Sequence, residues 1–205
     1  MNGDPDTRSA LVRASTSLFA QHGYDGTSIR AITRRANANL GAITYHFGSK
    51  DGLYDAVIES LVEPMRAFAA EAARAEGPPL DRIERLVRGL FQFLKEHPEL
   101  LRLLTQHLAG PRPLPGPARN TIQTNIRLLA SLIAEGQRGG SVRPGDPLLL
   151  ALSIGAQPMW LSLARRALQE GGAIDQDDPD AHAQLVDSVV RFVRAGLSSY
   201  QEGTS

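Results

Sequence analysis

The sequence predicts an all-α fold, with three short helices in the first fifty residues and longer helices after them. Apolar residues recur every three or four positions through most of the 205 residues. No stretch alternates apolar and polar residues for long enough to require a sheet. Clusters of glycine and proline separate the helical stretches. With 42% apolar residues, the chain can bury a substantial core.

Composition and charge exclude several classes of protein. The chain has no cysteine, which rules out disulfides, thiolate zinc sites and cysteine nucleophiles. It has no apolar signal region at the N-terminus and no run of roughly 18 uncharged apolar residues, so we expect a soluble, cytoplasmic protein with no membrane association. The net charge is zero, but residues 1–50 carry six basic and three acidic residues, against 16 and 19 in the rest. A basic N-terminal segment suits contact with phosphates.

The short helices are predicted from periodicity and from residues that begin or end helices. Gly23 suits the position just past the end of the first helix. Thr27 and Ser28 are good N-cap residues for the second. The expected ranges are 6–22, 28–37 and 40–47.

The longer helices are bounded by proline and glycine clusters, the longest being the eight-residue segment 110–117. Pro64 and Pro158 fall inside expected helices, where each removes one backbone hydrogen bond, so we expect a kink or a local break at both. The expected ranges are 50–75, 79–96, 98–109, 117–138, 147–170 and 179–199.

Residues 27–50 have the spacing of a helix-turn-helix, in which a supporting helix and a tight turn precede a helix that enters the major groove. Asn37 lies at the turn, and asparagine tolerates the left-handed backbone that such a turn needs. The inner face of the two helices is expected to consist of Ile29, Ile32, Ile43 and Phe47. Small, aromatic and hydroxyl residues remain on the outer face, which predicts that this face meets a partner.

These residues carry a family resemblance. The stretch from Gly23 to Tyr54 resembles the N-terminal signature of TetR-type transcriptional regulators, and the resemblance extends over about residues 7–60. The matching positions are Gly23-Tyr24, Thr27-Ser28, the turn 36–39, the aromatic group 45–47 and Ser49-Lys50. The chain differs from the usual pattern at Asn37, where the family has glycine, and at Leu40, where a basic or polar residue is common.

The resemblance implies two domains: a three-helix helix-turn-helix DNA-binding domain over residues 5–50, with its motif at about 28–47, and a helical effector-binding and dimerisation domain over residues 51–205. It implies a regulator that binds double-stranded operator DNA as a homodimer. Repression is the family default, relieved by a small-molecule effector. No catalytic residue, cofactor or metal is implied.

Carried over position by position, the resemblance assigns DNA contacts to eleven residues. They are Thr27, Ser28, Arg30, Asn39, Leu40, Gly41, Ala42, Thr44, Tyr45, His46 and Lys50. Thr27 and Ser28 would bind a phosphate at a helix N-terminus, and Lys50 would bind another phosphate. The small residues of the third helix favour contact with thymine methyl groups.

Each assignment has a structural alternative. Thr27 is also an ordinary helix cap, and Tyr45 or His46 would be explained equally by packing against the first helix. Arg34 and Arg35 end the supporting helix, where a favourable interaction with the helix dipole accounts for them without DNA.

In the second domain we expect a mostly apolar effector pocket, and therefore a largely hydrophobic or aromatic effector. Its predicted lining is Met65, Phe68, Phe91, Leu94, His97, Leu104, His107, Met159 and Trp160. The helices at 147–170 and 179–199 carry more apolar surface than one packed side needs, which predicts dimerisation through this pair. The alternative is that both faces belong to a monomeric bundle core.

Two other classes of function remain to be weighed. An enzyme is disfavoured because the chain lacks the nucleophile elbow, the phosphate-binding loops and the paired metal-binding histidines that would mark one. A helical adaptor that keeps the fold but no longer reads DNA is left open by the modest basic charge and by Leu40.

Overall fold

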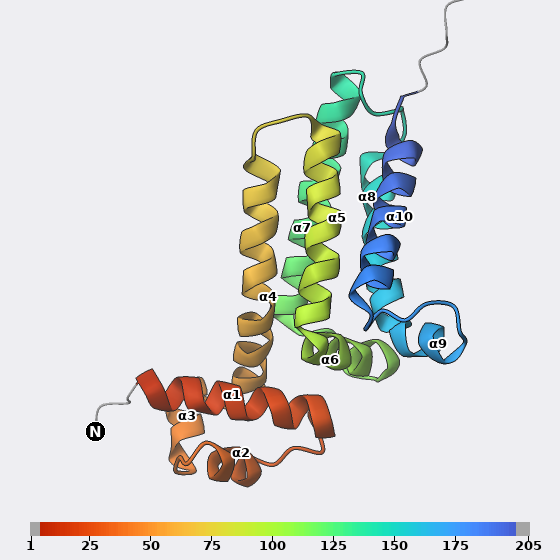
Figure 1. Cartoon of the computed structure of the whole chain (residues 1–205). Helices are drawn as coiled ribbons and strands as arrows, with labels where there is room; N and C mark the ends of the chain where they lie inside the picture. The colour runs from red at the N-terminus through yellow and green to blue at the C-terminus, as the bar shows by residue number, and fades with distance from the viewer. Residues whose placement is uncertain (1–4, 200–205) are drawn as a thin grey trace, which may run out of the picture. The chain divides into compact units, whose positions relative to one another are not determined.

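The computed structural model describes residues 5–199, and within that range it consists of helices and their connections with one isolated β-bridge between Val142 and Ser198. The helices are α1 (Pro5–His22), α2 (Ile29–Arg35), α3 (Gly41–Phe47), α4 (Lys50–Arg74), α5 (Pro79–Glu96), α6 (Pro98–Ala109), α7 (Gly116–Arg138), α8 (Pro147–Leu163), α9 (Arg165–Glu170) and α10 (Pro179–Leu197) (Figure 1). The prediction of an all-α fold is confirmed.

One predicted helix is divided, although not at its proline. The range 147–170 forms two helices, which separate at Ala164. Pro158 is buried inside α8 and Pro64 lies inside α4, and neither helix ends there. Of the kink or local break expected at each proline, the break does not occur, because each helix continues past the position where one backbone hydrogen bond is lost.

The residues cluster into two compact units. The first extends to Pro64 and includes 97–121. In it, α1 packs against α2, α3 and α6. Its largest fully buried side chains are Leu11, Phe19, Ile32, Ile43, Leu53, Val57, Ile58 and Leu103. The inner face predicted for the helix-turn-helix is thus largely confirmed, because Ile32 and Ile43 are buried while Ile29 and Phe47 are half-buried.

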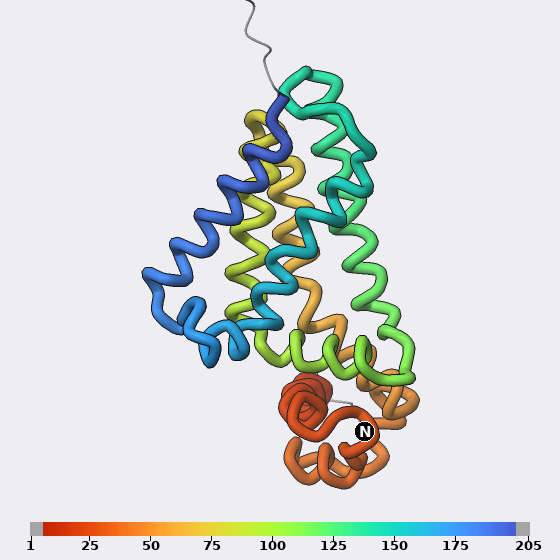
Figure 2. Tube along the Cα trace, turned by 90° about the vertical axis from the view of Figure 1, so that its right-hand side faces the viewer, coloured from red at the N-terminus to blue at the C-terminus, as the bar shows by residue number. Residues whose placement is uncertain are grey.

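The second unit comprises 65–96 and the chain from Ile122 onwards. Here α5 packs against both α8 and α10, as Figures 1 and 2 show. Its core includes Ile83, Phe91, Leu132, Ile133 and Ala151. Arg82 links three helices of this unit, since its guanidinium forms a two-pronged ion pair with Glu135 at 2.8 and 2.9 Å and donates to the Ala73 carbonyl at 2.8 Å.

No helix within residues 5–199 is both long enough and apolar enough to cross a membrane. In the same part of the chain, histidine and carboxylate side chains nowhere gather into a group of three or more that would hold a metal ion.

Candidate nucleic-acid interface and body pocket

The turn of the helix-turn-helix has the backbone that its sequence predicts. Asn37 has φ of 51°, and no other non-glycine residue between 5 and 199 has a positive φ. The Ala38 N–H, just after it, donates to the Thr33 carbonyl at 2.9 Å and closes the end of α2. At the other end of α2, the Ser28 hydroxyl accepts a hydrogen bond from the Ala31 N–H at 3.1 Å. A side-chain cap at one end and a backbone hydrogen bond at the other thus fix the supporting helix.

The second helix of the motif, α3, is also fixed by its own residues. The Asn39 carboxamide oxygen accepts from the Ala42 N–H at 2.8 Å, which caps the helix N-terminus. Gly48, with φ of 75°, ends it. These contacts fix the two ends of α3, which also packs against α1 and α2.

The outer face of α3 is open and carries large side chains. Leu40 is 53% exposed and Tyr45 70% exposed, whereas Ile43 on the inner face is 1% exposed. We call the exposed residues of this segment the recognition face: Asn39, Leu40, Gly41, Thr44 and Tyr45. His46 borders this face and is half-buried, with its ring edge-on to Tyr45 at 4.9 Å between centroids.

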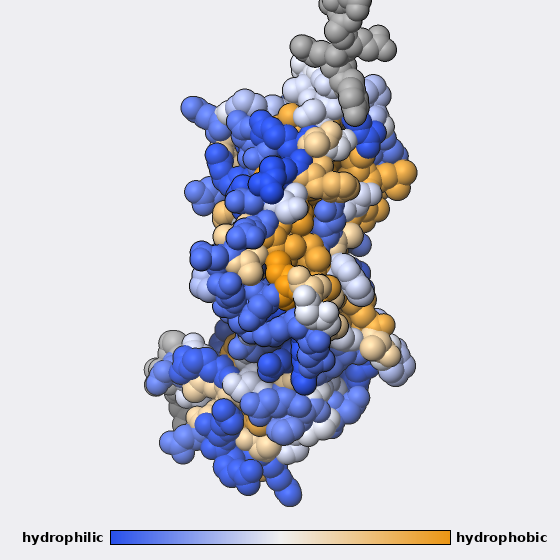
Figure 3. Space-filling model, turned by 45° about the vertical axis from the view of Figure 1, so that its right-hand side comes forward, coloured by the Kyte–Doolittle hydropathy of each residue, from blue (hydrophilic) through white to orange (hydrophobic). Residues whose placement is uncertain are grey.

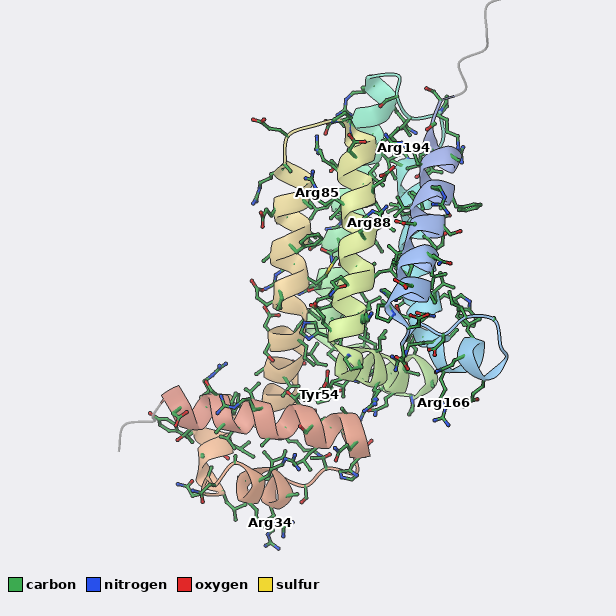
Figure 4. All side chains as sticks on the ribbon, viewed as in Figure 1. Arg34, Tyr54, Arg85, Arg88, Arg166 and Arg194 are labelled. Carbon is green, nitrogen blue, oxygen red and sulfur yellow. The ribbon has the colours of Figure 1, made fainter. Side chains whose placement is uncertain are left out.

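The supporting helix α2 exposes three basic side chains, Arg30, Arg34 and Arg35. None of the three forms an ion pair with a residue that the structure describes. Figure 4 shows Arg34 extending away from α2 into solvent. Unpaired guanidinium groups beside an exposed aromatic suit a polyanionic partner.

Two residues assigned to DNA point inward, which corrects the prediction. Thr27 is 2% exposed, and its hydroxyl hydrogen is shared between the Leu18 and Gly23 carbonyls, at 3.1 and 2.7 Å. Its side chain is therefore a buried link to α1 that no phosphate can reach. Ala42 is 8% exposed, so its methyl group belongs to the core and not to the recognition face.

Lys50 has a partner within the protein. Its ammonium donates to the Tyr24 carbonyl at 2.6 Å and lies 4.2 Å from the centroid of the Tyr24 ring. Partial burial lowers the pKa of this ammonium from its usual value. An ammonium has three N–H donors, so two remain for a phosphate. Lys50 thus anchors the start of α4 to the segment between α1 and α2.

A second cation on Tyr24 comes from a segment that sequence analysis did not connect to this site. Arg112, in the proline-rich connection after α6, lies 3.9 Å from the Tyr24 ring centroid and pairs with Asp25 at 3.2 Å and Asp51 at 3.8 Å. The Tyr24 hydroxyl donates to Asp51 at 2.6 Å. Burial first, and then this bond to the carboxylate, raise the pKa of Tyr24 to about 12. Arg112 and Asp25 are 87 positions apart in the sequence. No local sequence pattern links residues so distant, so only the fold reveals that Arg112 belongs to this group of contacts.

Nearby, His107 has a role different from the one predicted. Its Nε2 lies 2.8 Å from the Tyr54 hydroxyl, and Tyr54 packs edge-on against Phe19 at 4.8 Å between centroids. Burial raises the pKa of Tyr54 to about 12. His107 therefore belongs to the first compact unit, where it contacts Tyr54.

The nine predicted pocket residues have different surroundings in the structure. Met65, Leu94 and Leu104 are buried core residues, and Trp160 is 66% exposed on α8. Only Phe68 and Phe91 line the pocket of about 390 Å³ found in the second unit. Its lining is Phe68, Arg85, Arg88, Gly89, Phe91, Gln92, His182 and Val186. The lining surface of this pocket is mostly apolar, and arginine, glutamine and histidine side chains contribute its polar part.

The remaining surface feature is a set of exposed apolar residues on α8 and α10. They are Leu148 (48% exposed), Leu149 (62%), Leu152 (44%), Trp160 (66%) and Phe192 (68%). We call this set the apolar stripe. Its α8 members recur at helical spacing, so they share one side of the helix. Figure 3 shows apolar patches on the side of the molecule that includes these helices.

A fixed helix-turn-helix with an exposed tyrosine and unpaired arginines, in a chain that also contains a helical bundle, defines a DNA-binding regulator. Comparison with known proteins gives the family. The family model for bacterial regulatory proteins of the tetR family matches residues 11–57, and the model for the tetracyclin repressor-like C-terminal domain matches residues 79–193. The chain belongs to the TetR family of helix-turn-helix transcriptional regulators. Members of this family bind operator DNA and act as dimers with ligand-binding C-terminal domains.

Individual relatives agree over nearly the whole chain. The transcriptional regulator RutR of Escherichia coli K12 is 26% identical over 196 residues, which are 93% of this chain and 90% of RutR. The transcriptional repressor NicS of Pseudomonas putida KT2440 is 25% identical over 202 residues, 93% of this chain and 92% of NicS. The solved structure of the TetR family regulator PfmR from Thermus thermophilus has the same fold, with a TM-score of 0.71, 17% identity and coverage of 92% of this chain and 99% of that one.

Proposed function

We propose that this regulator is a homodimeric repressor, with a DNA-binding domain over residues 5–50 and an effector-binding and dimerisation domain over 51–205, released from its operator by a small molecule. The observation that carries the proposal is the recognition face of α3. Repression is supported by the relative NicS, which is named a repressor. Release by an effector is supported by the ligand-binding C-terminal domain of the family.

The proposed DNA contacts follow from which side chains are open. Those retained from the prediction are Ser28, Arg30, Asn39, Leu40, Gly41, Thr44, Tyr45, His46 and Lys50. The Ser28 oxygen caps α2, but its hydrogen remains available to a phosphate. Similarly, the NH₂ group of Asn39 remains free to donate, because only its oxygen is used in the cap. Leu40 and the Tyr45 ring suit apolar contact with thymine methyl groups.

The apolar stripe is the proposed dimer interface. Large apolar side chains more than 40% exposed on α8 and α10, which both pack against α5, are costly in water unless a partner covers them. A two-fold dimer that pairs α8 and α10 with their copies would cover the stripe with itself. It would also present two recognition faces to successive major grooves.

The test is a mobility-shift titration of the full chain on the DNA upstream of its own gene, over a range of salt concentrations. Wild type is expected to bind selectively, with affinity that falls steeply with salt. Tyr45→Ala should weaken binding by roughly tenfold or more, because it removes a hydroxyl contact to a charged group and an aromatic surface. It should leave folding unchanged, since the side chain is 70% exposed.

Two matched variants sharpen the result. Tyr45→Phe keeps the ring and removes only the hydroxyl, so it separates a phosphate bond from an apolar contact. His22→Ala changes an exposed side chain of α1 outside the motif and should bind like wild type. Equal binding by wild type and Tyr45→Ala would overturn the assignment of the recognition face and favour a helical adaptor.

A further inference from the structure

The pocket of the second unit lies among three helices. Phe68 comes from α4, Arg85 to Gln92 come from α5, and His182 and Val186 come from α10. Figure 4 shows Arg85 and Arg88 on α5, between α4 and α10. At about 390 Å³ it falls in the range of pockets that hold small organic molecules.

The charge of the pocket is positive and only partly balanced. Arg88 pairs with Asp187 at 2.6 Å, an exposed contact that leaves other N–H groups of the guanidinium free. Arg85 forms no ion pair or hydrogen bond with a described residue. No acidic residue is part of the lining. A guanidinium without a partner at the edge of a pocket favours a planar anion that it can bind through two parallel hydrogen bonds.

The pocket also contains a polar atom without a partner. His182 Nδ1 is buried and makes no hydrogen bond within the described structure. Burial, followed by the nearby charge of Lys95, lowers the pKa of this imidazole. The ring is therefore neutral at pH 7 and can offer one N–H and one lone pair.

The apolar side of the pocket depends on a glycine. A Cβ built on Gly89 would lie 2.0 Å from Cε1 of Phe68, so a larger residue there would displace the ring. Glycine inside a helix lowers stability relative to alanine, and here it permits Phe68 to lie close against α5. Phe91 and Val186 complete this apolar side.

We propose that the α4–α5–α10 pocket binds a small organic carboxylate, with the carboxylate on Arg85 and the apolar body against Phe68, Phe91 and Val186. His182 donates to or accepts from a polar substituent of the ligand. This inference rests on the proposed function, because it gives the chemical class of the effector. It changes the expectation from a largely hydrophobic effector to an anionic one with an apolar body.

The experiment compares three carboxylates with their neutral amides on the full-length protein by isothermal titration calorimetry. The probes are benzoate, 4-phenylbutyrate and octanoate, with benzamide, 4-phenylbutanamide and octanamide. At least one carboxylate is expected to bind about tenfold or more tightly than its amide, because only the charged group pairs with Arg85. Binding of none of the three carboxylates, or equal binding of acid and amide, would overturn the proposal.

Three variants locate the site. Arg85→Ala should weaken carboxylate binding about tenfold or more, whereas Arg127→Ala, which removes an exposed arginine of α7 outside the pocket, should not change it. Gly89→Ala should abolish binding with an unchanged circular dichroism spectrum, because it moves the Phe68 ring without altering charge. Unchanged binding in Arg85→Ala would place the anion elsewhere and sink the assignment.

Operator binding by the same preparations separates this inference from the proposed function. The expected result is that the carboxylate releases wild type, but not Arg85→Ala, from operator DNA. If wild type binds its operator and no carboxylate binds, the pocket assignment fails and the regulator stands. If carboxylates bind through Arg85 and no operator complex forms, the pocket assignment stands and the repressor proposal fails.

Discussion

Two surfaces of this protein expose large apolar side chains, and their surroundings differ. The recognition face carries Leu40 and Tyr45, in a motif whose supporting helix exposes Arg30, Arg34 and Arg35. The apolar stripe carries three leucines, Trp160 and Phe192 on α8 and α10. The first surface combines a few apolar groups with unpaired positive charge, whereas the second combines many apolar groups over two helices.

The difference shows why exposure alone does not identify a partner. An exposed aromatic beside free guanidinium groups suits DNA, which offers phosphates together with methyl groups and base edges. A stripe of leucine and aromatic residues suits a partner with an equally apolar surface, because removing both apolar surfaces from water is favourable. Each surface can be altered separately, and the effects should differ in kind as well as in size.

The largest effect is expected from Phe192→Asp. A carboxylate at this 68% exposed position would be buried in the proposed dimer interface, where an unpaired charge is strongly unfavourable. The protein should become monomeric by sedimentation. Its operator affinity should fall roughly 10²–10⁴-fold, because a monomer engages only one half-site.

Ala183→Asp is the control for this change. It adds the same charge to an exposed position of α10 that is nine residues from Phe192, and so about half a turn away around the helix. This variant should remain dimeric. A Phe192→Asp protein that still sediments as a dimer would show that the apolar stripe is not the interface.

An intermediate effect is expected within the helix-turn-helix, where two adjacent hydroxyl residues have different surroundings. Thr27→Val keeps the shape but leaves the Leu18 and Gly23 carbonyls without their hydrogen bond. It should lower the free energy of unfolding by about 1–3 kcal/mol, measured by urea denaturation, without reducing the operator affinity of the folded protein. Ser28→Ala removes the cap of α2, which should cost about 1 kcal/mol and also weaken operator binding.

The opposite pattern would reverse the two assignments. A stable Thr27→Val protein with weakened operator binding would mean that the Thr27 hydroxyl turns outward to a phosphate on the DNA. Normal operator affinity in Ser28→Ala would leave Ser28 with a purely structural role as a helix cap.

These two residues also show how far sequence reasoning reached. Helix positions and the left-handed turn at Asn37 were predictable because they depend on residues a few positions apart. Whether Thr27 or Ser28 faces inward depends on the position of α1. On α3, Ala42 is buried whereas its neighbour Gly41 is exposed, and the sequence pattern alone did not separate these two positions. The family resemblance assigns roles to positions, but it does not show which side chains are buried or hydrogen-bonded within the protein and therefore cannot contact DNA.

The second compact unit was less predictable for a related reason. Its helices follow from periodicity, whereas its pocket depends on which side chains of three helices meet, and aromatic residues alone do not show that. Arg85 and Arg88 look like ordinary surface residues of an amphipathic helix in the sequence. Gly89 carried a usable signal, because a glycine in the middle of a predicted helix often marks a close approach by a neighbour.

The smallest effect is expected at Tyr24, whose ring contacts Lys50 and Arg112 and belongs to neither the recognition face nor the apolar stripe. Tyr24→Phe removes the hydrogen bond to Asp51 and should lower the stability by about 1 kcal/mol at pH 8. The pKa of Tyr24 is raised from 10.0 to about 12, chiefly by burial, so the folded state favours the protonated phenol. Its contribution is complete below pH 10 and is lost as the pH rises through 12. Thermal unfolding of both proteins at pH 8, 10 and 11 should therefore show the wild-type advantage shrinking above pH 10. If the wild-type advantage stays constant to pH 11, the Tyr24 phenol has the same pKa in the folded and unfolded chains. In that case, the hydrogen bond from the Tyr24 hydroxyl to Asp51 does not stabilise the protonated phenol.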